Sequence, residues 1–162
     1  MSLIILFGPA GAGKTYIGKL LAKHLGYYFY DGDADLTAEM KLALNKMRPI
    51  TDPMRDRFFE NLFKSIDLLQ RQHKKLVVAQ TFIKEKYRRR LKKARFFLVK
   101  TKPAIRYARR QKRADYPWDE TYVKKMDSLF ELPTIPHRVI TNDKSGSTHL
   151  LKQLRSLLSA LS

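Results

Sequence analysis

A stretch near the start of the chain has the residue types and spacing of a phosphate-binding loop. It reads G-x-x-x-x-G-K-T from Gly8 to Thr15 and directly follows the apolar run 3–7. A strand, a glycine-rich turn and a helix in this order gather backbone N–H groups around one concavity at the positive end of the helix. Lys14 is expected to reach the β- and γ-phosphates of a nucleotide, and the Thr15 hydroxyl to ligate Mg²⁺. The predicted nucleoside triphosphate site comprises Gly8, Ala10, Gly11, Ala12, Gly13, Lys14, Thr15 and Tyr16.

Polar side chains follow two further apolar runs. Asp31 and Asp33 come after the aromatic run 27–30, and Gln80 follows the run 76–79. In an open parallel sheet the carboxyl ends of the strands form the edge where ligands bind, and the glycine loop lies at the same edge. Two carboxylates there could hold Mg²⁺ through water and accept a proton from a substrate hydroxyl, and Gln80 could hold that hydroxyl or a water of the metal. The alternative is a simple polar turn, because Asp-Gly is common in turns.

One arginine lies at a position where the local electrostatic field is unfavourable for a cation. The pattern predicts a long helix from about Met54 to Leu69, with Asp52 as its N-cap and Pro53 at the first helical position. Arg55 falls in the first turn, where a cation opposes the helix dipole. It is therefore a candidate ligand for an anionic group, with an ordinary surface arginine as the alternative.

Alternating apolar runs and amphipathic segments predict an α/β fold with five strands in one parallel sheet and helices on both faces. The expected strands are 3–7, 27–30, 76–79, 96–99 and 137–142. The expected helices include 14–24, 37–47, a basic helix over 84–94, and one opened by Pro103 whose outward side carries Arg106, Arg109, Arg110 and Arg113.

The whole chain, residues 1–162, is expected to form a single domain with two helical insertions. The first, about 34–70, is predicted to bind a phosphate acceptor. The second, about 106–132, is predicted to close over the nucleotide as an arginine-bearing lid. Closure of such a lid excludes water, which would otherwise take the phosphate.

Charge is the unusual feature of the composition. The 162 residues carry a formal net charge of +18, and between Lys84 and Arg113 fifteen basic residues accompany a single acid, Glu85. Such a field favours phosphates, acidic metabolites or nucleic acid as partners, although a solvated basic face has the same composition. There is no cysteine, and the first apolar run is too short for a membrane span. These features predict a cytoplasmic protein without a membrane partner.

Taken together, the motifs resemble the gluconate kinase and shikimate kinase group of small P-loop kinases, above all bacterial gluconate kinases. The resemblance extends from the phosphate loop to Pro133. Besides the loop it rests on Asp31-Gly32-Asp33, Pro49-Ile50-Thr51-Asp52 with Arg55, Tyr87-Arg88, Arg109 with Arg113, and 130–133.

This resemblance implies a P-loop NTPase fold of the nucleoside-monophosphate-kinase-like type, with ATP and Mg²⁺ as cofactors. Asp33 would bind the acceptor hydroxyl and act as its base, and Asp31 would help to hold the water shell of Mg²⁺. Arg55 would hold the carboxylate of the acceptor. Arg109 would stack on the adenine, and Arg113 would reach the transferring phosphate.

The sequence departs from these families where the acceptor should sit. Gluconate kinases carry a histidine three residues after the second aspartate, where this chain has Leu36. They carry Cys-Ser-Ala-Leu-Lys after the third strand, where this chain has Ala79-Gln80-Thr81-Phe82-Ile83. The glycine triplet of shikimate kinases is absent from that position too. Whether Leu36 and Gln80 change specificity or abolish activity is left open.

The leading hypothesis is an ATP-dependent kinase of a small anionic metabolite, with a gluconate-like sugar acid as the acceptor. A nucleotide or polynucleotide 5′-hydroxyl kinase is one alternative, suggested by the basic tract 84–113. A non-catalytic, ATP-dependent nucleic-acid-binding protein is another, and its affinity should fall steeply with salt. The protein is expected to be a monomer or a homodimer, and nucleic acid is the less favoured partner.

Overall fold

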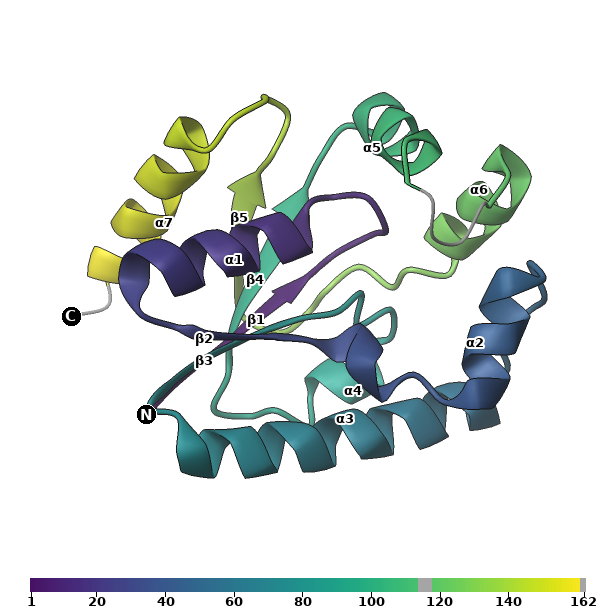
Figure 1. Ribbon diagram of the computed structural model, residues 1–162, viewed down its shortest axis with the longest axis horizontal. Coiled ribbons are helices and arrows are strands. Elements are labelled where there is room, and N and C mark those ends of the chain that lie inside the picture. The colour runs from purple at the N-terminus through teal and green to yellow at the C-terminus, as the bar shows by residue number, and fades with distance from the viewer. Residues whose placement is uncertain (114–117, 161–162) are drawn as a thin grey trace.

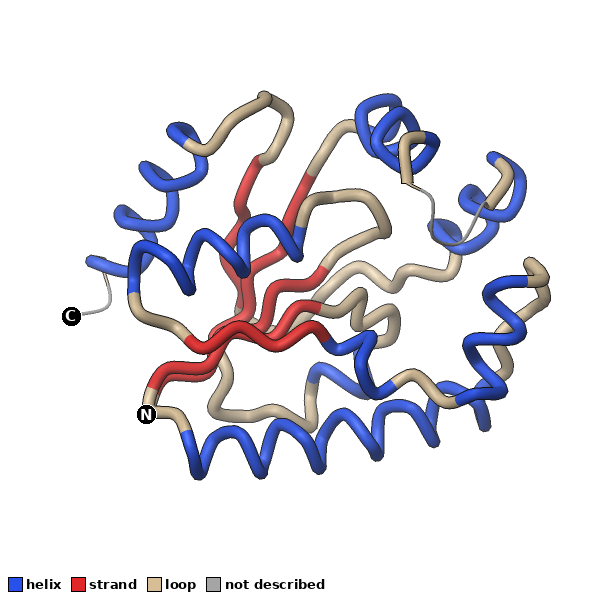
Figure 2. Tube along the Cα trace, viewed as in Figure 1, coloured by secondary structure: helices blue, strands red, loops and turns tan. Residues whose placement is uncertain are grey.

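Five parallel strands form one sheet in a computed structural model that describes residues 1–113 and 118–160. The strand order is β2-β3-β1-β4-β5, and every neighbouring pair is parallel, so all five strands end at the same edge (Figures 1 and 2). The prediction of a five-stranded parallel sheet is confirmed. The strands are β1 (Ser2–Phe7), β2 (Tyr28–Asp31), β3 (Lys75–Ala79), β4 (Arg95–Lys100) and β5 (His137–Thr141).

Helices cover both faces of the sheet, as predicted. The helices α1 (Lys14–Leu25) and α7 (Thr148–Ser159) pack on the face that carries Ile4 and Leu6. The long helix α3 (Asp52–Gln72) packs with α4 (Glu85–Arg88) on the face that carries Leu3, Ile5 and Phe7 (Figure 1). Because β1 is central and buried on both sides, it reads as a continuous apolar run.

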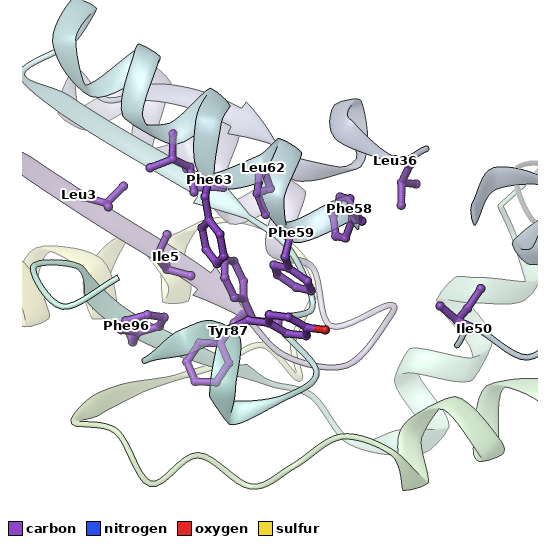
Figure 3. Close-up of a cluster of buried hydrophobic side chains, with 14 of the residues drawn as sticks. Leu3, Ile5, Leu36, Ile50, Phe58, Phe59, Leu62, Phe63, Tyr87 and Phe96 are labelled. Carbon is purple, nitrogen blue, oxygen red and sulfur yellow. The ribbon is translucent and has the colours of Figure 1, made fainter. Parts of the chain in front are cut away.

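Aromatic side chains of α3 form the centre of the second layer. Phe58, Phe59 and Phe63 lie on the buried side of the helix, and the ring of Phe59 stacks on Tyr87 with ring centroids 3.8 Å apart (Figure 3). This face has the helical spacing that the sequence predicts. Its rings pack against the sheet and so fix α3 beneath the strands.

Shorter helices gather beyond the carboxyl ends of the strands. They are the 3₁₀ turn η1 (Gly32–Asp35), α2 (Ala38–Asn45), α5 (Pro103–Gln111) and α6 (Glu120–Ser128) (Figure 1). Both predicted helical insertions contribute to this group. No helix in the described residues is long and apolar enough to cross a membrane.

Two local expectations are wrong. Thr51, not Asp52, caps α3, because its hydroxyl accepts a hydrogen bond from the Met54 N–H at 3.3 Å. The basic helix expected over 84–94 is one short turn, α4, followed by tight turns back to β4. Like charges three and four residues apart destabilise a longer helix there.

The expected outward side of α5 is also corrected. Arg106 and Arg110 are buried, and Arg113 lies beyond the end of the helix. The reason is a counter-charge that comes from a distant part of the chain. Asp127 of α6 accepts two hydrogen bonds from the Arg106 guanidinium, at 3.1 and 2.8 Å, and so draws that arginine inward.

Arg88 of the basic tract is a fully buried structural residue. Its guanidinium donates to the carbonyl oxygens of Phe82, Ile83 and Glu131 and forms an ion pair with Glu85 at 2.8 Å. The same group lies 5.0 Å from the ring centroid of Phe7. A planar cation with several donors thus ties the loop after β3 to the segment after α6.

Arg88→Met should lower the free energy of unfolding by about 3 kcal/mol, because it leaves buried carbonyl oxygens and the Glu85 carboxylate without their donor. The matched control is Arg89→Met, whose side chain is 66% exposed and which should cost less than about 1 kcal/mol. Urea denaturation of both variants measures the difference. Equal losses in the two variants would contradict the structural role of Arg88.

Candidate active site

A cavity of about 480 Å³ opens at the carboxyl edge of the sheet. It has the size of an ordinary small-molecule site. Most of the residues predicted for the site line it, and Gly8 and Ala12 do not. The predicted residues that line the cavity are Ala10, Gly11, Gly13, Lys14, Thr15, Tyr16, Asp31, Asp33, Arg55, Gln80, Arg109 and Arg113.

The glycine loop is pressed against the ends of β4 and β5. Gly13 has a φ of 98°, and a Cβ there would lie 2.2 Å from Nδ2 of Asn142. Gly8 has a φ of 144°, and its Cβ would lie 2.7 Å from the carbonyl oxygen of Val99. Any side chain at either position would therefore collide with the protein itself, so the glycines are needed for packing as well as for the loop conformation.

Polar side chains from the same two strand ends hold the loop in place. The buried Ala12 carbonyl accepts hydrogen bonds from the Asn142 amide and the Thr101 hydroxyl, both at 2.9 Å. Ala12 is therefore an anchor of the loop and does not face the cavity. Sequence reasoning assigned no role to Thr101 and Asn142. Their position at or just beyond the ends of two predicted strands is the pattern that could have identified them.

Lys14 begins α1 and lies across its own loop. Its ammonium donates to the carbonyl oxygens of Gly8 at 2.7 Å and Pro9 at 2.9 Å. Burial lowers the pKa of Lys14 from 10.5 to about 8, while the Asp33 carboxylate acts in the opposite direction. A partly desolvated ammonium is thereby held at the mouth of the loop, where an anionic phosphate would stabilise its charge.

Asp31 and Asp33 lie in the turn that follows β2. An Asp31 oxygen accepts the Asp33 N–H at 3.0 Å, which caps η1. The Gln80 amide donates to an Asp33 oxygen at 2.9 Å, and its own oxygen accepts the Thr81 N–H. Asp33 is reached by solvent, but the walls of the cleft exclude much of the surrounding water, and this desolvation raises the pKa of its carboxyl. Gln80 thus orients a carboxylate whose protonated form is favoured more than usual.

Arg55 is buried at the start of α3, and its guanidinium is only partly hydrogen-bonded. One terminal nitrogen lies 3.4 Å from Asp52, and the other has no hydrogen-bond partner among the described residues. Because a buried donor without an acceptor is costly, a guanidinium that faces a cavity in this state is suited to an anionic ligand group. The structure therefore brings Arg55 to the same cavity as Lys14 and Asp33.

Two arginines of α5 approach the phosphate loop in different ways. Arg109 donates to the carbonyl oxygen of Asn142 at 3.1 Å and lines the cavity beside Gly13. Arg106 donates to the Ala10 carbonyl at 3.2 Å while it pairs with Asp127. Arg106 therefore links the loop to α6, a role that the sequence pattern did not indicate.

Strand order, glycine loop and loop lysine together define a P-loop nucleotide-binding domain. A family model described as an AAA domain matches residues 4–126, and the chain belongs to that family.

Several solved structures of similar fold are small-molecule kinases. A sugar kinase from a Janibacter species superimposes with a TM-score of 0.82 at 19% identity, over 98% of this chain and 95% of that one. A gluconokinase from Sinorhizobium meliloti superimposes with a TM-score of 0.78 at 20% identity, over 99% and 95%. At these identities the likeness establishes the fold and confirms the predicted fold class.

In sequence, a probable gluconokinase from Xenopus tropicalis is 32% identical over 86 residues, which are 53% of this chain and 45% of that protein. The chain thus matches less than half the length of this curated relative.

The lowered pKa of Lys14 predicts proton uptake on nucleotide binding. Phosphates stabilise the ammonium and raise the pKa of Lys14 from about 8, so at about pH 8.5 binding of MgATP should draw a proton from the buffer. Calorimetry in buffers of different ionisation enthalpy measures this uptake. In Lys14→Arg, which remains protonated, the uptake should disappear. Equal proton uptake by both proteins would contradict the prediction.

Proposed function

We propose that this protein is an ATP-dependent small-molecule kinase that transfers the γ-phosphate of ATP to a hydroxyl of a small anionic acceptor. The observation that carries the proposal is the convergence of three groups on one cavity: the phosphate loop with Lys14, the carboxylate of Asp33, and the partly unsatisfied Arg55. One end of the cavity suits phosphates, and the other offers a base for a hydroxyl and a cation for an acid group.

The phosphate end has donors for ATP and oxygen ligands for a metal. Backbone N–H groups of the loop and Lys14 would bind the β- and γ-phosphates. Thr15 and Asp31 line the same cavity and offer hard oxygen atoms. The described residues hold no cluster of three or more His, Cys, Asp or Glu that could bind a metal, but Mg²⁺ commonly takes few protein ligands and completes its shell with phosphates and water. Bound there, Mg²⁺ would neutralise phosphate charge.

In the proposed reaction the acceptor oxygen forms a bond to the γ-phosphorus while the bond from that phosphorus to the β-phosphate bridging oxygen breaks. ADP leaves, and the proton of the acceptor hydroxyl passes to Asp33. Arg55 would hold the acid group so that the hydroxyl faces the phosphate. Such in-line positioning supplies most of the catalysis in phosphoryl transfer.

The helical segments would complete the site around both substrates. We assign about 34–70 to acceptor binding and about 106–132 to a lid that brings Arg109 to the adenine and Arg113 to the transferring phosphate. Residues 114–117 of this lid lie outside the described part of the chain. The use of ATP favours the cytoplasm as the compartment of the enzyme.

Gluconate is the reference acceptor for this proposal, because the relatives include proteins named gluconokinase and probable gluconokinase. The basic tract 84–113 gives the nucleic-acid alternatives less support than its composition suggests. Arg88, Arg106 and Arg110, which belong to it, are buried. Lys86 pairs with Asp56 at 3.0 Å. These cations serve contacts within the protein.

Asp33→Asn should lower kcat at least about 100-fold, because it removes the proposed base. It should leave the Kd for MgATP nearly unchanged. In the wild type the rate should fall on the acid side at a higher pH than for an ordinary aspartate, since the raised pKa of Asp33 keeps the carboxyl protonated to higher pH.

Coupled measurement of ADP release with each candidate acid tests the Asp33 prediction. The matched control is Asp35→Asn in the same turn, whose carboxylate accepts from Tyr30 and Ser65 and does not line the cavity. Full activity of Asp33→Asn would refute the proposed base. An absence of acceptor-dependent ADP release in the wild type, with MgATP bound, would refute the kinase.

Arg55→Met should raise the KM for an acidic acceptor by about 10- to 100-fold, the effect of losing one or two charged hydrogen bonds. The KM for ATP should stay close to that of the wild type. Arg57→Met is the control, because Arg57 lies two residues further along α3, is exposed, and pairs with Glu39. Steady-state kinetics of both variants measure the KM for the acceptor and the KM for ATP. An unchanged acceptor KM in Arg55→Met would mean that another cation binds the acid.

A further inference from the structure

The acceptor end of the cavity is walled mainly by apolar side chains. They include Leu36, Leu44, Ile50 and Phe58, which belong to the hydrophobic cluster beneath the sheet, and Met40 and Trp118, which pack against that cluster. In Figure 3, Leu36 and Ile50 stand apart from the close-packed rings around Phe63 and Tyr87, on the far side of Phe58. This end of the cavity is therefore an apolar lobe that continues the core.

Polar side chains in the apolar lobe are few, and several are engaged within the protein. Both ends of the Gln80 amide are hydrogen-bonded, to Asp33 and to the Thr81 N–H. The indole N–H of Trp118 donates to the Leu44 carbonyl at 2.9 Å, and the Arg110 guanidinium lies 4.2 Å from the centroid of its ring. Of the charged side chains that line the cavity, we assign Asp33 and Arg55 to the two ends of an acceptor.

Two positions at which the sequence departs from gluconate kinases lie in this wall. Leu36 stands where those enzymes carry a histidine, and Ile83 stands where they carry a lysine. Both side chains are buried, and both line the cavity. At these two positions the cavity has apolar side chains where the resembling enzymes carry polar ones, whereas Thr81 is polar where they carry alanine.

We propose that the acceptor is a hydroxy acid whose carbon body between the hydroxyl and the acid group is apolar, such as an aromatic or alicyclic ring, and not a polyhydroxylated chain. This inference rests on the proposed function. Asp33 takes the proton of the single reacting hydroxyl, Arg55 binds the acid, and the apolar lobe covers the ring. The new bond joins the hydroxyl oxygen to the γ-phosphorus, and ADP leaves.

The physical reason lies in the hydroxyl groups of a sugar acid. Each hydroxyl that enters an apolar wall loses its hydrogen bonds to water and gains none from the protein. Each methylene or ring carbon in the same place gains by leaving water. An acceptor with an apolar body should therefore be preferred over gluconate by at least about tenfold in kcat/KM.

The test uses the full chain with MgATP and a series of hydroxy acids with apolar bodies. The series contains 3- and 4-(hydroxymethyl)benzoate and 3- and 4-hydroxycyclohexanecarboxylate, so that the distance between hydroxyl and acid varies. Gluconate is the polyhydroxylated comparison, and 4-methylbenzyl alcohol is the comparison without an acid group. ADP release and the mass of the phosphorylated product are measured for each compound.

A member of the series with kcat/KM at least about tenfold above that of gluconate supports the inference. Equal or better use of gluconate overturns it and leaves the kinase proposal intact. If no compound is phosphorylated, the kinase proposal fails, and equilibrium binding in the presence of ADP then decides the inference. Binding of one member at least about tenfold tighter than gluconate supports it, and any other result overturns it.

A variant pair tests whether the wall itself sets this preference. Leu36→Gln should narrow the ratio of kcat/KM between the best apolar acid and gluconate by about threefold or more, since it gives the wall a polar group. Leu68→Gln is the matched control, because Leu68 is exposed on α3 outside the cavity. An unchanged ratio in a Leu36→Gln protein that still binds MgATP would count against the apolar wall. If Leu36→Gln does not fold, the wild-type series alone decides.

Discussion

The phosphate loop is anchored to the ends of β4 and β5, and the rest of the structure depends on this attachment. Thr101 and Asn142 hold the Ala12 carbonyl from two strands that are far from the loop in sequence. Gly13 must lack a side chain because the Asn142 amide occupies that space. The loop conformation is thus built into the sheet, so its N–H groups need little reorganisation to receive a phosphate.

Several of the many arginines in this small protein are engaged in contacts within the protein. Arg88 links the loop after β3 to the segment after α6, and Arg106 links the phosphate loop to α6 through Asp127. Arg55 is the contrasting case, since one of its nitrogens is buried and has no hydrogen-bond partner in the described part of the chain. A buried arginine with its donors satisfied is structural, whereas one that faces a cavity unsatisfied indicates a ligand.

The two ends of the cavity are built from different kinds of chemical group. The phosphate end is made of backbone groups and a few charged side chains, and its geometry is independent of what receives the phosphate. The acceptor end is lined by side chains of α2, α3 and the segment after β3, which also form the core beneath the sheet. Its chemistry can therefore change by single substitutions, such as those at Leu36 and Ile83, while the fold and the nucleotide chemistry stay the same.

The sequence by itself determined the sheet and the nucleotide end of the site, because both depend on local patterns: buried runs of strand length, and glycines with Lys14 at fixed spacing. It failed at Arg106, expected outside, because the Asp127 carboxylate that draws this arginine inward comes from a distant part of the chain. It also failed at the helix expected over 84–94, where like charges three and four residues apart leave only the short turn α4. The sequence also did not predict which apolar side chains line the acceptor end of the cavity. Only tertiary packing brings Leu36, Ile50 and Trp118 together, since no local pattern encodes which buried side chains face a cavity and which face one another.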